Sequence, residues 1–327
     1  MFASDTTIQE ILSMPSSLQS TTSVAVLGCG LIGESWSALF LAHGLDVVAW
    51  DPDDGVLSAL PERVEPLLAQ LRALGPVADR PGRLSVAPSV AAAVGTAGWI
   101  QENAPEKTAI KHALYAEVEA AAPPDAVIAS STSSLTWTDL AAGVTRRDRF
   151  ITAHPFNPPH LMPLVELFAA DEWTLGRAET FYRSLGRVTV ALKKDAVGHI
   201  ANRLASALWR EAVNIVAEGI ADVGDVDAAL VHGPGLRWSV IGAHMAYHLG
   251  GGSGGIAHYL DHLGPSQERR WTTLGTPSLT PEVRRLLIEG IAQEAAGRSI
   301  AALEAERDRG LMLALAARRK AEEGENT

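Results

Sequence analysis

Basic residues are scarce in this sequence, and lysine is the scarcest of them. The 327 residues include 27 lysines and arginines against 38 aspartates and glutamates, which gives a formal net charge of −11. Only five of these cations are lysines, and they form no basic stripe: Lys107, Lys111, Lys193, Lys194 and Lys320. Nucleic acids and anionic membrane surfaces require clustered positive charge. We therefore expect neither a nucleic acid nor a membrane among the partners.

Cysteine and long apolar runs are also nearly absent. Cys29 is the single cysteine, which excludes an internal disulfide and fits a reducing compartment. No stretch of about 18 apolar residues lacks glycine, proline or charge, so we expect no transmembrane helix. Residues 1–20 have neither a basic start nor an apolar core, and so they do not resemble a signal peptide. These features predict a cytoplasmic enzyme, and we expect no metal site.

Apolar residues are plentiful, at 47% of the chain, which is enough to build sizeable cores. The length suggests two domains of roughly 150 residues each. The run Val24–Leu27 stops at a glycine, as a buried parallel strand does. Apolar residues then recur at helical spacing over Glu34–His43, and Val47–Trp50 reads as a second strand. The first segment of the chain therefore predicts a strand, a helix and a strand in succession.

Further strand-like runs continue this pattern, with alanine-rich helical stretches between several of them: Leu84–Val86, Gly98–Gln101, Ala126–Ser130, Phe150–Ala153, Leu164–Phe168 and Val188–Leu192. Alternating strands and helices predict an α/β fold of the Rossmann type, with a doubly wound, mostly parallel sheet. After Lys194 the signals are helical, over 198–219, 226–231 and 281–323. We predict an arm over 1–22, a nucleotide domain over 23–194 and an all-helical domain over 195–327. The glycine-rich stretch 249–255 is a candidate hinge or lid.

The segment Gly28-Cys29-Gly30-Leu31-Ile32-Gly33 has the glycine spacing G-x-G-x-x-G between a predicted strand and a predicted helix. Gly28 permits the tight turn, Gly30 lets the backbone approach a pyrophosphate, and Gly33 lets the helix pack closely on the strand. The phosphates then meet the free N–H groups of the helix N-terminus. The motif predicts a dinucleotide site that includes Leu31 and Ile32.

Asp51 follows Gly33 by eighteen residues and closes the second predicted strand, where a carboxylate accepts the ribose hydroxyls of a dinucleotide. Asp53 and Asp54 come next, and there is no arginine before Arg63. Three carboxylates would repel a 2′-phosphate. The sequence therefore favours NAD over NADP.

A second polar cluster comprises Ser130–Ser134, His154, Glu166 and Asn202. The serines and His154 each follow a predicted strand, so they share the carboxyl edge of the sheet with the ligand crevice. A histidine can take a proton from an alcohol while hydride leaves the same carbon, and Glu166 on a returning strand could orient it. Serine and asparagine groups can hold the substrate oxygen. Structural roles stay open at this point: a turn histidine, an outward-facing glutamate and a helix cap.

Five segments together resemble the L-3-hydroxyacyl-CoA dehydrogenase superfamily: Val24–Asp51, Ala129–Leu135, His154–Pro158, Leu164–Leu167 and Gly198–Arg203. The match spans residues 23–240 or so, in the family's order. It implies a Rossmann domain, a helical dimerising domain and NAD-dependent oxidation of an L-3-hydroxyl. It also assigns roles: His154 as the base, Glu166 as its carboxylate partner, Ser133 on the substrate oxygen and cofactor, Asn202 at the domain junction, and Glu102 beside the nicotinamide.

One departure from this family concerns residues 52–84, where hydroxyacyl-CoA enzymes carry a lysine-rich helical hairpin. This segment has no lysine and four arginines: Arg63, Arg72, Arg80 and Arg83. A coenzyme A ester carries several phosphate charges, so weak cationic provision disfavours it, although the arginines leave it open. The segment Gly233–Trp238 is more similar to the branch that acts on small free 3-hydroxy acids, which includes L-carnitine and L-gulonate dehydrogenases of the lambda-crystallin type.

Within that branch, Arg237-Trp238 and Pro159-His160 favour L-carnitine, oxidised to 3-dehydrocarnitine, with L-gulonate and 3-hydroxybutyryl-CoA as alternatives. Arg237 could hold the substrate carboxylate or form an interdomain or dimer salt bridge. Trp238 and other aromatic residues could surround a trimethylammonium group or pack in a core: Tyr247, Tyr259 and Trp271. Two further classes remain as rivals, a non-catalytic NAD-binding protein and a β-hydroxyacid dehydrogenase or imine reductase. The latter is disfavoured because Gly198 stands where its lysine would be.

Overall fold

The computed structural model describes residues 23–75 and 77–324. The predicted arm over 1–22 lies outside the described residues. Every strand in them falls on a predicted strand segment: β1 (Ser23–Leu27), β2 (Asp46–Trp50), β3 (Leu84–Val86), β4 (Trp99–Glu102), β5 (Val127–Ser130), β6 (Phe150–Pro155), β7 (Leu164–Phe168) and β8 (Val188–Ala191).

These strands form one eight-stranded sheet in the described part of the chain, in the order β3-β2-β1-β4-β5-β6-β7-β8. Neighbouring strands are parallel except for β6 and β7, which are antiparallel. The strand order reverses between β1 and β4, and the crevice outside such a switch point is where doubly wound sheets bind ligands. The predicted class, a doubly wound and mostly parallel sheet followed by a helical region, is confirmed.

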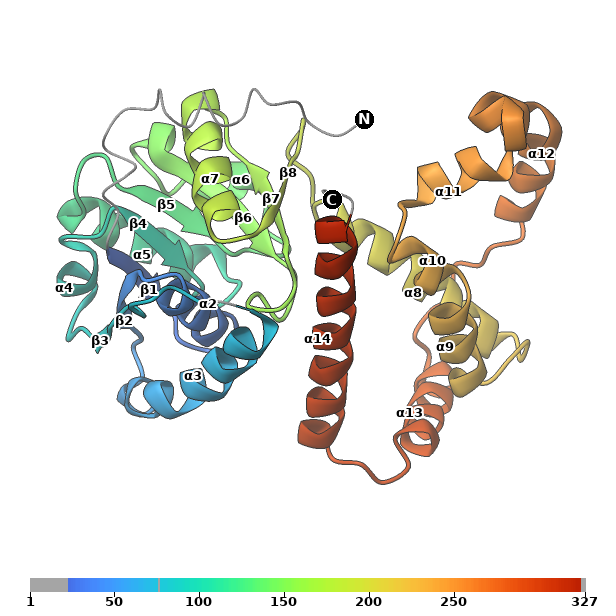
Figure 1. The fold of residues 1–327 in the computed structure, drawn as a ribbon, viewed down its shortest axis with the longest axis horizontal. Coiled ribbons are helices and arrows are strands. Elements are labelled where there is room, and N and C mark those ends of the chain that lie inside the picture. Colours follow the sequence, from blue (N-terminus) through green and yellow to red (C-terminus); the bar gives the residue numbers. More distant parts are fainter. Residues whose placement is uncertain (1–22, 76, 325–327) are drawn as a thin grey trace. The chain divides into compact units, whose positions relative to one another are not determined.

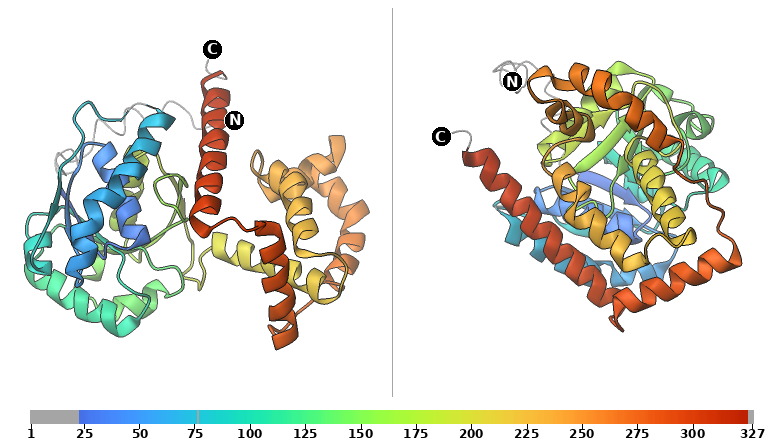
Figure 2. Two further views of the ribbon diagram at one scale, coloured as in Figure 1. Left: turned by 90° about the horizontal axis from the view of Figure 1, so that it is seen from below. Right: turned by 90° about the vertical axis from the view of Figure 1, so that its right-hand side faces the viewer.

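Helices cover both faces of the sheet, and each face has its own core (Figures 1 and 2). On one face the sheet packs against α2 (Leu31–Ala42), α3 (Asp54–Leu74) and α7 (Glu172–Ser184). On the other it packs against α4 (Val90–Val94), α5 (Thr108–Ala121) and α6 (Trp137–Ala141), with a 3₁₀ turn at Arg147–Arg149 before β6. Each large apolar side chain that is fully buried in these cores contributes about 1.5–3 kcal/mol to the stability of the fold. The two cores therefore fix the strand ends on which the polar clusters stand.

The chain divides into two compact units. The described residues up to Asn202 form the first, together with those from Arg307 onward, and Arg203–Glu306 forms the second. The final helix, α14 (Ile300–Gly324), contributes its later part to the first unit. There the Asp308 carboxylate accepts a hydrogen bond from the Gln70 amide, at 3.1 Å.

His160 belongs to the same polar chain in the first unit. Its Nε2 lies 2.6 Å from the Gln70 amide oxygen, and its Nδ1 lies 2.8 Å from the Ser35 hydroxyl. Burial lowers the pKa of His160 to about 4, so the ring is neutral near pH 7. His160 therefore connects α2 with α3, and Gln70 continues the chain of hydrogen bonds to α14. Both ring nitrogens of His160 are occupied by protein groups.

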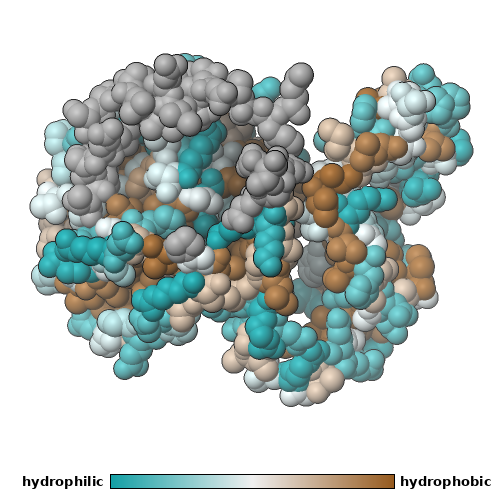
Figure 3. Space-filling view, viewed as in Figure 1, coloured by the Kyte–Doolittle hydropathy of each residue, from teal (hydrophilic) through white to brown (hydrophobic). Residues whose placement is uncertain are grey.

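The second unit is helical throughout, as predicted for this part of the chain. Its helices are α8 (Ala201–Ala217), which begins in the first unit, α9 (Val223–His232), α10 (Pro234–Trp238), α11 (Ala243–Gly250), α12 (Gly255–Trp271) and α13 (Pro281–Ala295). The glycine-rich segment forms the end of α11, a 3₁₀ turn at Gly252–Gly254 and the start of α12. Large apolar side chains are exposed on these helices, as the brown areas around α10 and α11 show in Figure 3. No helix among the described residues is long and apolar enough to span a membrane.

Candidate active site

The glycine turn between β1 and α2 has the geometry that its spacing predicts. Gly28 has a φ of +88°, and a Cβ there would press against the backbone of Asn103. A Cβ on Gly33 would collide with the Gly28 carbonyl, which is why the helix can approach the strand only with glycine at this position. Gly30 faces open space, and no side chain caps the N-terminus of α2. The exposed N–H groups and the room beside Gly30 fit a dinucleotide pyrophosphate.

Asp51 holds this turn from the end of β2. One carboxylate oxygen accepts the Cys29 N–H at 2.8 Å, and the other accepts the Asp53 N–H at 3.0 Å. Asp53 in turn caps α3 through the N–H groups of Gly55 and Val56. The carboxylates therefore stand at the end of β2, where a dinucleotide ribose binds in this fold.

His154 and Glu166 form the centre of the chemical site. They are directly opposite each other in the antiparallel pair β6–β7, and His154 Nδ1 lies 2.9 Å from Glu166 Oε2. Both side chains are nearly inaccessible, with exposed fractions of 4% and 1%. The single antiparallel pairing in the sheet is thus what places the carboxylate beside the imidazole.

The other nitrogen of His154 faces Asn202 in the first turn of α8. Asn202 Nδ2 lies 3.3 Å from His154 Nε2, so the amide donates to an unprotonated nitrogen. The carboxylate at Nδ1 fixes the complementary proton there. His154 is therefore held with its Nε2 lone pair directed away from Glu166, as a general base requires.

Glu166 uses its second oxygen to anchor α8. Oε1 accepts the N–H groups of Ile200 at 2.7 Å and Ala201 at 3.0 Å. Burial alone would raise the pKa of Glu166, but the hydrogen bonds from His154 and from these two N–H groups lower it below its usual value. The carboxylate is therefore charged at neutral pH and can stabilise an imidazolium.

Ser133 lies just beyond β5, on the loop that Glu106 organises. The Glu106 carboxylate accepts N–H groups from Ser133 at 2.9 Å and Ser134 at 2.8 Å, and the Thr132 hydroxyl at 2.5 Å. The Ser133 hydroxyl is exposed and has no hydrogen-bond partner among the residues that the structure describes. The structure thus joins His154, Glu166 and Asn202 directly, while Ser133 stands on the neighbouring strand's end with a free hydroxyl.

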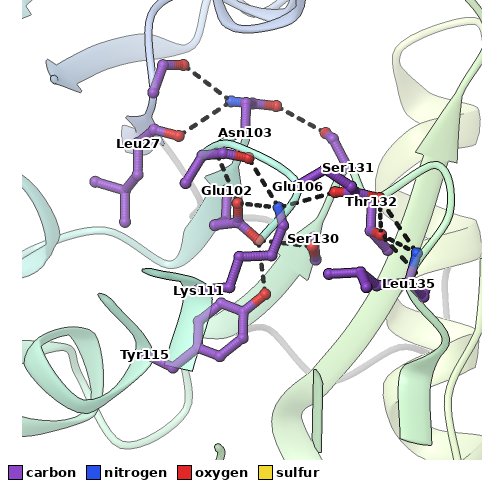
Figure 4. A network of polar contacts seen from close by, with 12 residues as sticks. Leu27, Glu102, Asn103, Glu106, Lys111, Tyr115, Ser130, Ser131, Thr132 and Leu135 are labelled. Atoms are coloured by element: carbon purple, nitrogen blue, oxygen red, sulfur yellow. Dashed lines mark hydrogen bonds and ion pairs between the residues drawn. The ribbon is translucent and has the colours of Figure 1, made fainter. Parts of the chain in front are cut away.

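Glu102 sits beneath this loop in a closed polar network, shown in Figure 4. It is fully buried and accepts hydrogen bonds from Lys111 Nζ at 2.7 Å, Tyr115 Oη at 2.6 Å and Ser130 Oγ at 2.6 Å. It also accepts the Ala104 N–H. Burial and the Glu102 charge raise the pKa of Tyr115 far above its usual value. Both oxygens of Glu102 are occupied by protein donors. Glu102 therefore stabilises the loop that carries Ser133 through hydrogen bonds within the protein.

Asn103 is the link between this network and the glycine turn. Its amide donates to the carbonyls of Leu27 and Gly28, each at 3.4 Å, and its oxygen accepts the Ser131 hydroxyl at 2.7 Å (Figure 4). The sequence reasoning missed Asn103, Glu106 and Lys111. Asn103 and Glu106 follow the fourth strand at the carboxyl edge of the sheet, which was the signal that could have identified them, whereas Lys111 lies on α5 and had no such signal.

The second unit holds the remaining predicted residues. Arg237 and Trp238 close α10; both are exposed, and the Arg237 guanidinium forms no ion pair or hydrogen bond with any described residue. Tyr247 and Tyr259 have ring centroids 5.1 Å apart, at an angle of 53°. Trp271 is exposed at the end of α12. No cluster of metal-binding side chains occurs within residues 23–75 and 77–324.

The chain is similar to known protein families in both of its units. Residues 23–196 match the family described as 3-hydroxyacyl-CoA dehydrogenase, NAD binding domain, and residues 198–277 match 3-hydroxyacyl-CoA dehydrogenase, C-terminal domain. An L-carnitine dehydrogenase of Nocardiopsis dassonvillei is 41% identical over 94% of both chains. An L-carnitine dehydrogenase of Streptomyces coelicolor is 44% identical over 90% of this chain and 94% of its own.

Among solved structures, one similar fold is that of 5-formyl-3-hydroxy-2-methylpyridine 4-carboxylic acid 5-dehydrogenase, an NAD⁺-dependent dismutase. It is 27% identical, covers 92% of this chain and 98% of its own, and has a TM-score of 0.77. The similarity therefore covers most of both chains.

Proposed function

The chain belongs to the 3-hydroxyacyl-CoA dehydrogenase family and is an NAD-dependent dehydrogenase, and from this premise we propose that it oxidises L-carnitine to 3-dehydrocarnitine. The observation that carries the chemistry is the array of His154, Glu166 and Asn202, in which the imidazole Nε2 is unprotonated and oriented. The relatives' substrate supports the choice of acid, and the residues below support it independently.

The proposed reaction removes a proton from the 3-hydroxyl and a hydride from C3, leaving a carbonyl. Bound NAD⁺ supplies the acceptor for the hydride. His154 Nε2 takes the hydroxyl proton, and the imidazolium that forms is stabilised by Glu166. Asn202 and the free hydroxyl of Ser133 hold the substrate oxygen. The residues that would line the pyrophosphate are Gly28, Gly30, Leu31, Ile32 and Gly33, and Asp51 would accept the ribose hydroxyls.

Glu102 acts on the cofactor side through other residues in this proposal. Its carboxylate holds Ser130 and Lys111, and Lys111 lies 3.5 Å from Glu106, which in turn holds the N–H groups around Ser133. The buried charge thus positions the loop beside the nicotinamide. A direct contact between Glu102 and the cofactor would require these hydrogen bonds to open.

A free acid is favoured over a coenzyme A ester by the charges around α3. Residues 52–84 contain no lysine, and three of their four arginines are already paired: Arg63 with Glu34, Arg72 with Glu65 and Arg83 with Asp46. The Arg72 and Arg83 pairs are exposed and therefore weak, at about 0–1 kcal/mol, whereas Glu34 of the Arg63 pair is largely buried. Each pair must open before its arginine can bind a phosphate. The segment therefore provides little ready positive charge for coenzyme A.

The two charged ends of carnitine match side chains of the second unit. Arg237 has a free guanidinium, which binds a carboxylate in a bidentate fork. The adjacent rings of Tyr247 and Tyr259 offer aromatic faces for a trimethylammonium group, with Trp238 nearby in the sequence. We propose Arg237 and Trp238 as substrate residues on this basis.

We also propose a homodimer formed through the helical unit, in the cytoplasm, where the unpaired Cys29 stays reduced. Within the described part of Arg203–Glu306, only Val213, Val216 and Val223 are buried apolar residues, whereas Leu260 and Ile288 are more than half exposed. Obligate dimer interfaces are apolar in this manner. Light scattering should give twice the chain mass, and a particle of 34.6 kDa would contradict the dimer.

A substrate screen tests the proposed function. NAD⁺ and NADP⁺ reduction is measured with L-carnitine, L-gulonate, L-3-hydroxybutyrate and L-3-hydroxybutyryl-CoA. We expect the highest kcat/KM with L-carnitine and NAD⁺. Arg237→Leu should raise KM for L-carnitine about tenfold or more with the KM for NAD⁺ unchanged, and Arg309→Leu, on exposed α14, is the matched control. Turnover of the thioester alone would overturn the choice of substrate.

A further inference from the structure

His199 occupies the turn before α8 in a backbone conformation that is unusual for its residue type. Its φ is +49°, and Gly198 before it has a φ of +76°. Non-glycine residues adopt this left-handed region at an energetic cost. The two residues turn the chain so that the N–H groups of Ile200 and Ala201 reach the Glu166 carboxylate. A second glycine would make this turn without the cost, so the side chain at 199 requires an explanation.

The His199 ring covers one face of the His154 ring. The two centroids are 4.7 Å apart and the planes differ by 16°, and His199 is only 3% exposed. Glu166 and Asn202 contact His154 at its edges, through the two ring nitrogens. Phe156 meets the His154 ring edge to face, with centroids 6.3 Å apart, whereas His199 stacks on it and so restrains the tilt that hydrogen bonds in the ring plane leave free.

His199 also has a nitrogen with no partner. Its Nδ1 is buried and makes no hydrogen bond, so a proton on that atom would be a buried, unsatisfied donor. The proton is therefore on Nε2 and the ring is neutral. Burial, followed by the charge of His154, lowers the pKa of His199; the carboxylates that act in the opposite direction are Glu166, Asp195 and Glu106.

We propose that His199 is a positioning residue of the dehydrogenase reaction, whose neutral ring fixes the plane of His154 and stabilises the positive charge that His154 gains from the substrate hydroxyl. This inference rests on the proposed role of His154 as the base. A cation over an aromatic face is attracted to it, and the attraction strengthens in a water-poor site. Two charged rings at 4.7 Å would repel each other, so the neutrality of His199 is part of the arrangement.

Three substitutions separate the possible contributions of the ring. His199→Phe keeps an aromatic face, His199→Leu keeps only apolar bulk with the same backbone cost, and His199→Asn removes the ring while tolerating the left-handed conformation. We expect kcat of His199→Phe within about threefold of the parent, and kcat of the other two reduced roughly fivefold to tenfold. The Kd of NADH, measured by fluorescence, should be unchanged in all three.

The pH profile distinguishes charge stabilisation from space filling. The acid limb of kcat/KM should lie about half a pH unit lower in His199→Leu than in His199→Phe, because only the aromatic ring favours the protonated form of His154. Identical limbs and identical kcat for these two variants would overturn the proposal. If both fail to fold, His199→Asn decides: parental kcat and an unmoved limb would refute a role for the ring.

Two controls keep this result separate from the proposed function. His262→Asn breaks the other stacked histidine pair, His258–His262, on exposed α12, and should leave both kcat and the limb unchanged. His154→Ala tests the base itself. If His154→Ala retains parental turnover, the proposed function fails; if it is inactive while all His199 variants match the parent, only the role of His199 fails.

Discussion

Two buried carboxylates, Glu102 and Glu166, organise the carboxyl edge of the sheet, and they differ in whether their hydrogen-bond partners can still react with a substrate. Glu102 is surrounded by protein donors on both oxygens: Lys111, Tyr115, Ser130 and the Ala104 N–H. Glu166 contacts His154 through one oxygen and the start of α8 through the other. His154 still presents an unprotonated Nε2 to the site. The first array is closed, and the second ends at a group that can react.

The difference explains why similar residues serve different purposes. A closed array of charges stabilises one loop conformation, and removing one member leaves the others unpaired in a dry interior. In the open array, His154 is already oriented to take a proton before the substrate binds. Variants of the Glu166 array should therefore change turnover, and variants of the Glu102 array should mainly change stability.

The largest effect is expected at His154. His154→Ala should reduce kcat by about 10³-fold, roughly 4 kcal/mol in activation free energy, because no other group takes the hydroxyl proton. Glu166→Gln should reduce kcat by about 10²-fold, since a neutral amide stabilises the imidazolium less. Steady-state kinetics with L-carnitine and NADH titration provide the measurements.

NADH affinity is the control for this prediction. Both variants should bind NADH within about twofold of the parent, because His154 and Glu166 lie on β6 and β7, outside the glycine turn. Equal losses of turnover and NADH affinity would identify His154 as a structural histidine and would remove the contrast between the arrays.

Lys111→Met tests the closed array. The substitution leaves the Glu102 carboxylate buried without its cation, and breaking such a pair costs about 3–5 kcal/mol. The urea midpoint of the first unit, measured by tryptophan fluorescence, should move to a lower urea concentration. The folded protein should retain most of its kcat.

The double variant Lys111→Met with Glu102→Gln is the matched control. Removing both charges eliminates the unpaired carboxylate, so a large part of the lost stability should return. A Lys111→Met protein as stable as the parent would show that the pair does not hold the loop.

The course of the fold could be predicted from the sequence because its signals are local. Each strand in the described part of the chain matches an apolar run, and the glycine turn at Gly28 is recognised from the spacing of three glycines within six consecutive residues. The pairing of His154 with Glu166 could also be anticipated, because β7 had to return beside β6. The helical character of residues after 195 followed from periodicity alone.

Other features depend on contacts between distant segments, and periodicity carries no information about them. The buried position of Lys111 requires Glu102, nine residues away, and Ser130 on another strand. Asp308 joins Gln70 over 238 residues of sequence, so the return of α14 to the first unit has no local signal. The orientation of His199 depends on a left-handed backbone angle that the residue type disfavours.

A smaller effect, dependent on pH, is expected at Glu106. Burial raises its pKa, but the Thr132 hydroxyl, the N–H groups of Ser134 and Leu135 and the charge of Lys111 lower it from 4.5 to about 2. Because the folded pKa lies below the unfolded one, this carboxylate stabilises the fold fully above about pH 5. The contribution, on the order of 2 kcal/mol after allowance for partial exposure, is lost as the pH falls from 4.5 toward 2.

Comparing the stability of Glu106→Gln with that of the parent measures this contribution. Urea midpoints of the parent and the variant should be well separated at pH 7 and should converge as the pH falls below 4.5. Glu65→Gln, which removes an exposed carboxylate of α3, controls for general charge effects. A separation that is constant from pH 7 to pH 3.5 would refute the role of the Glu106 charge in holding the Ser133 loop.

The smallest effect on activity is expected from modification of Cys29. This residue tests whether the glycine turn, like the Glu102 array, is closed to solvent. Burial, followed by the charge of Asp51, raises the pKa of the thiol to about 12, so almost no thiolate forms at pH 8. Iodoacetamide should leave the activity of the native enzyme unchanged over an hour and should alkylate the urea-unfolded chain rapidly. Cys29→Ala should be equally resistant and fully active. Rapid inactivation of the parent, prevented by NADH, would mean that the glycine turn opens to solvent. The contrast between a closed and an open region would then hold only for the Glu102 and Glu166 arrays.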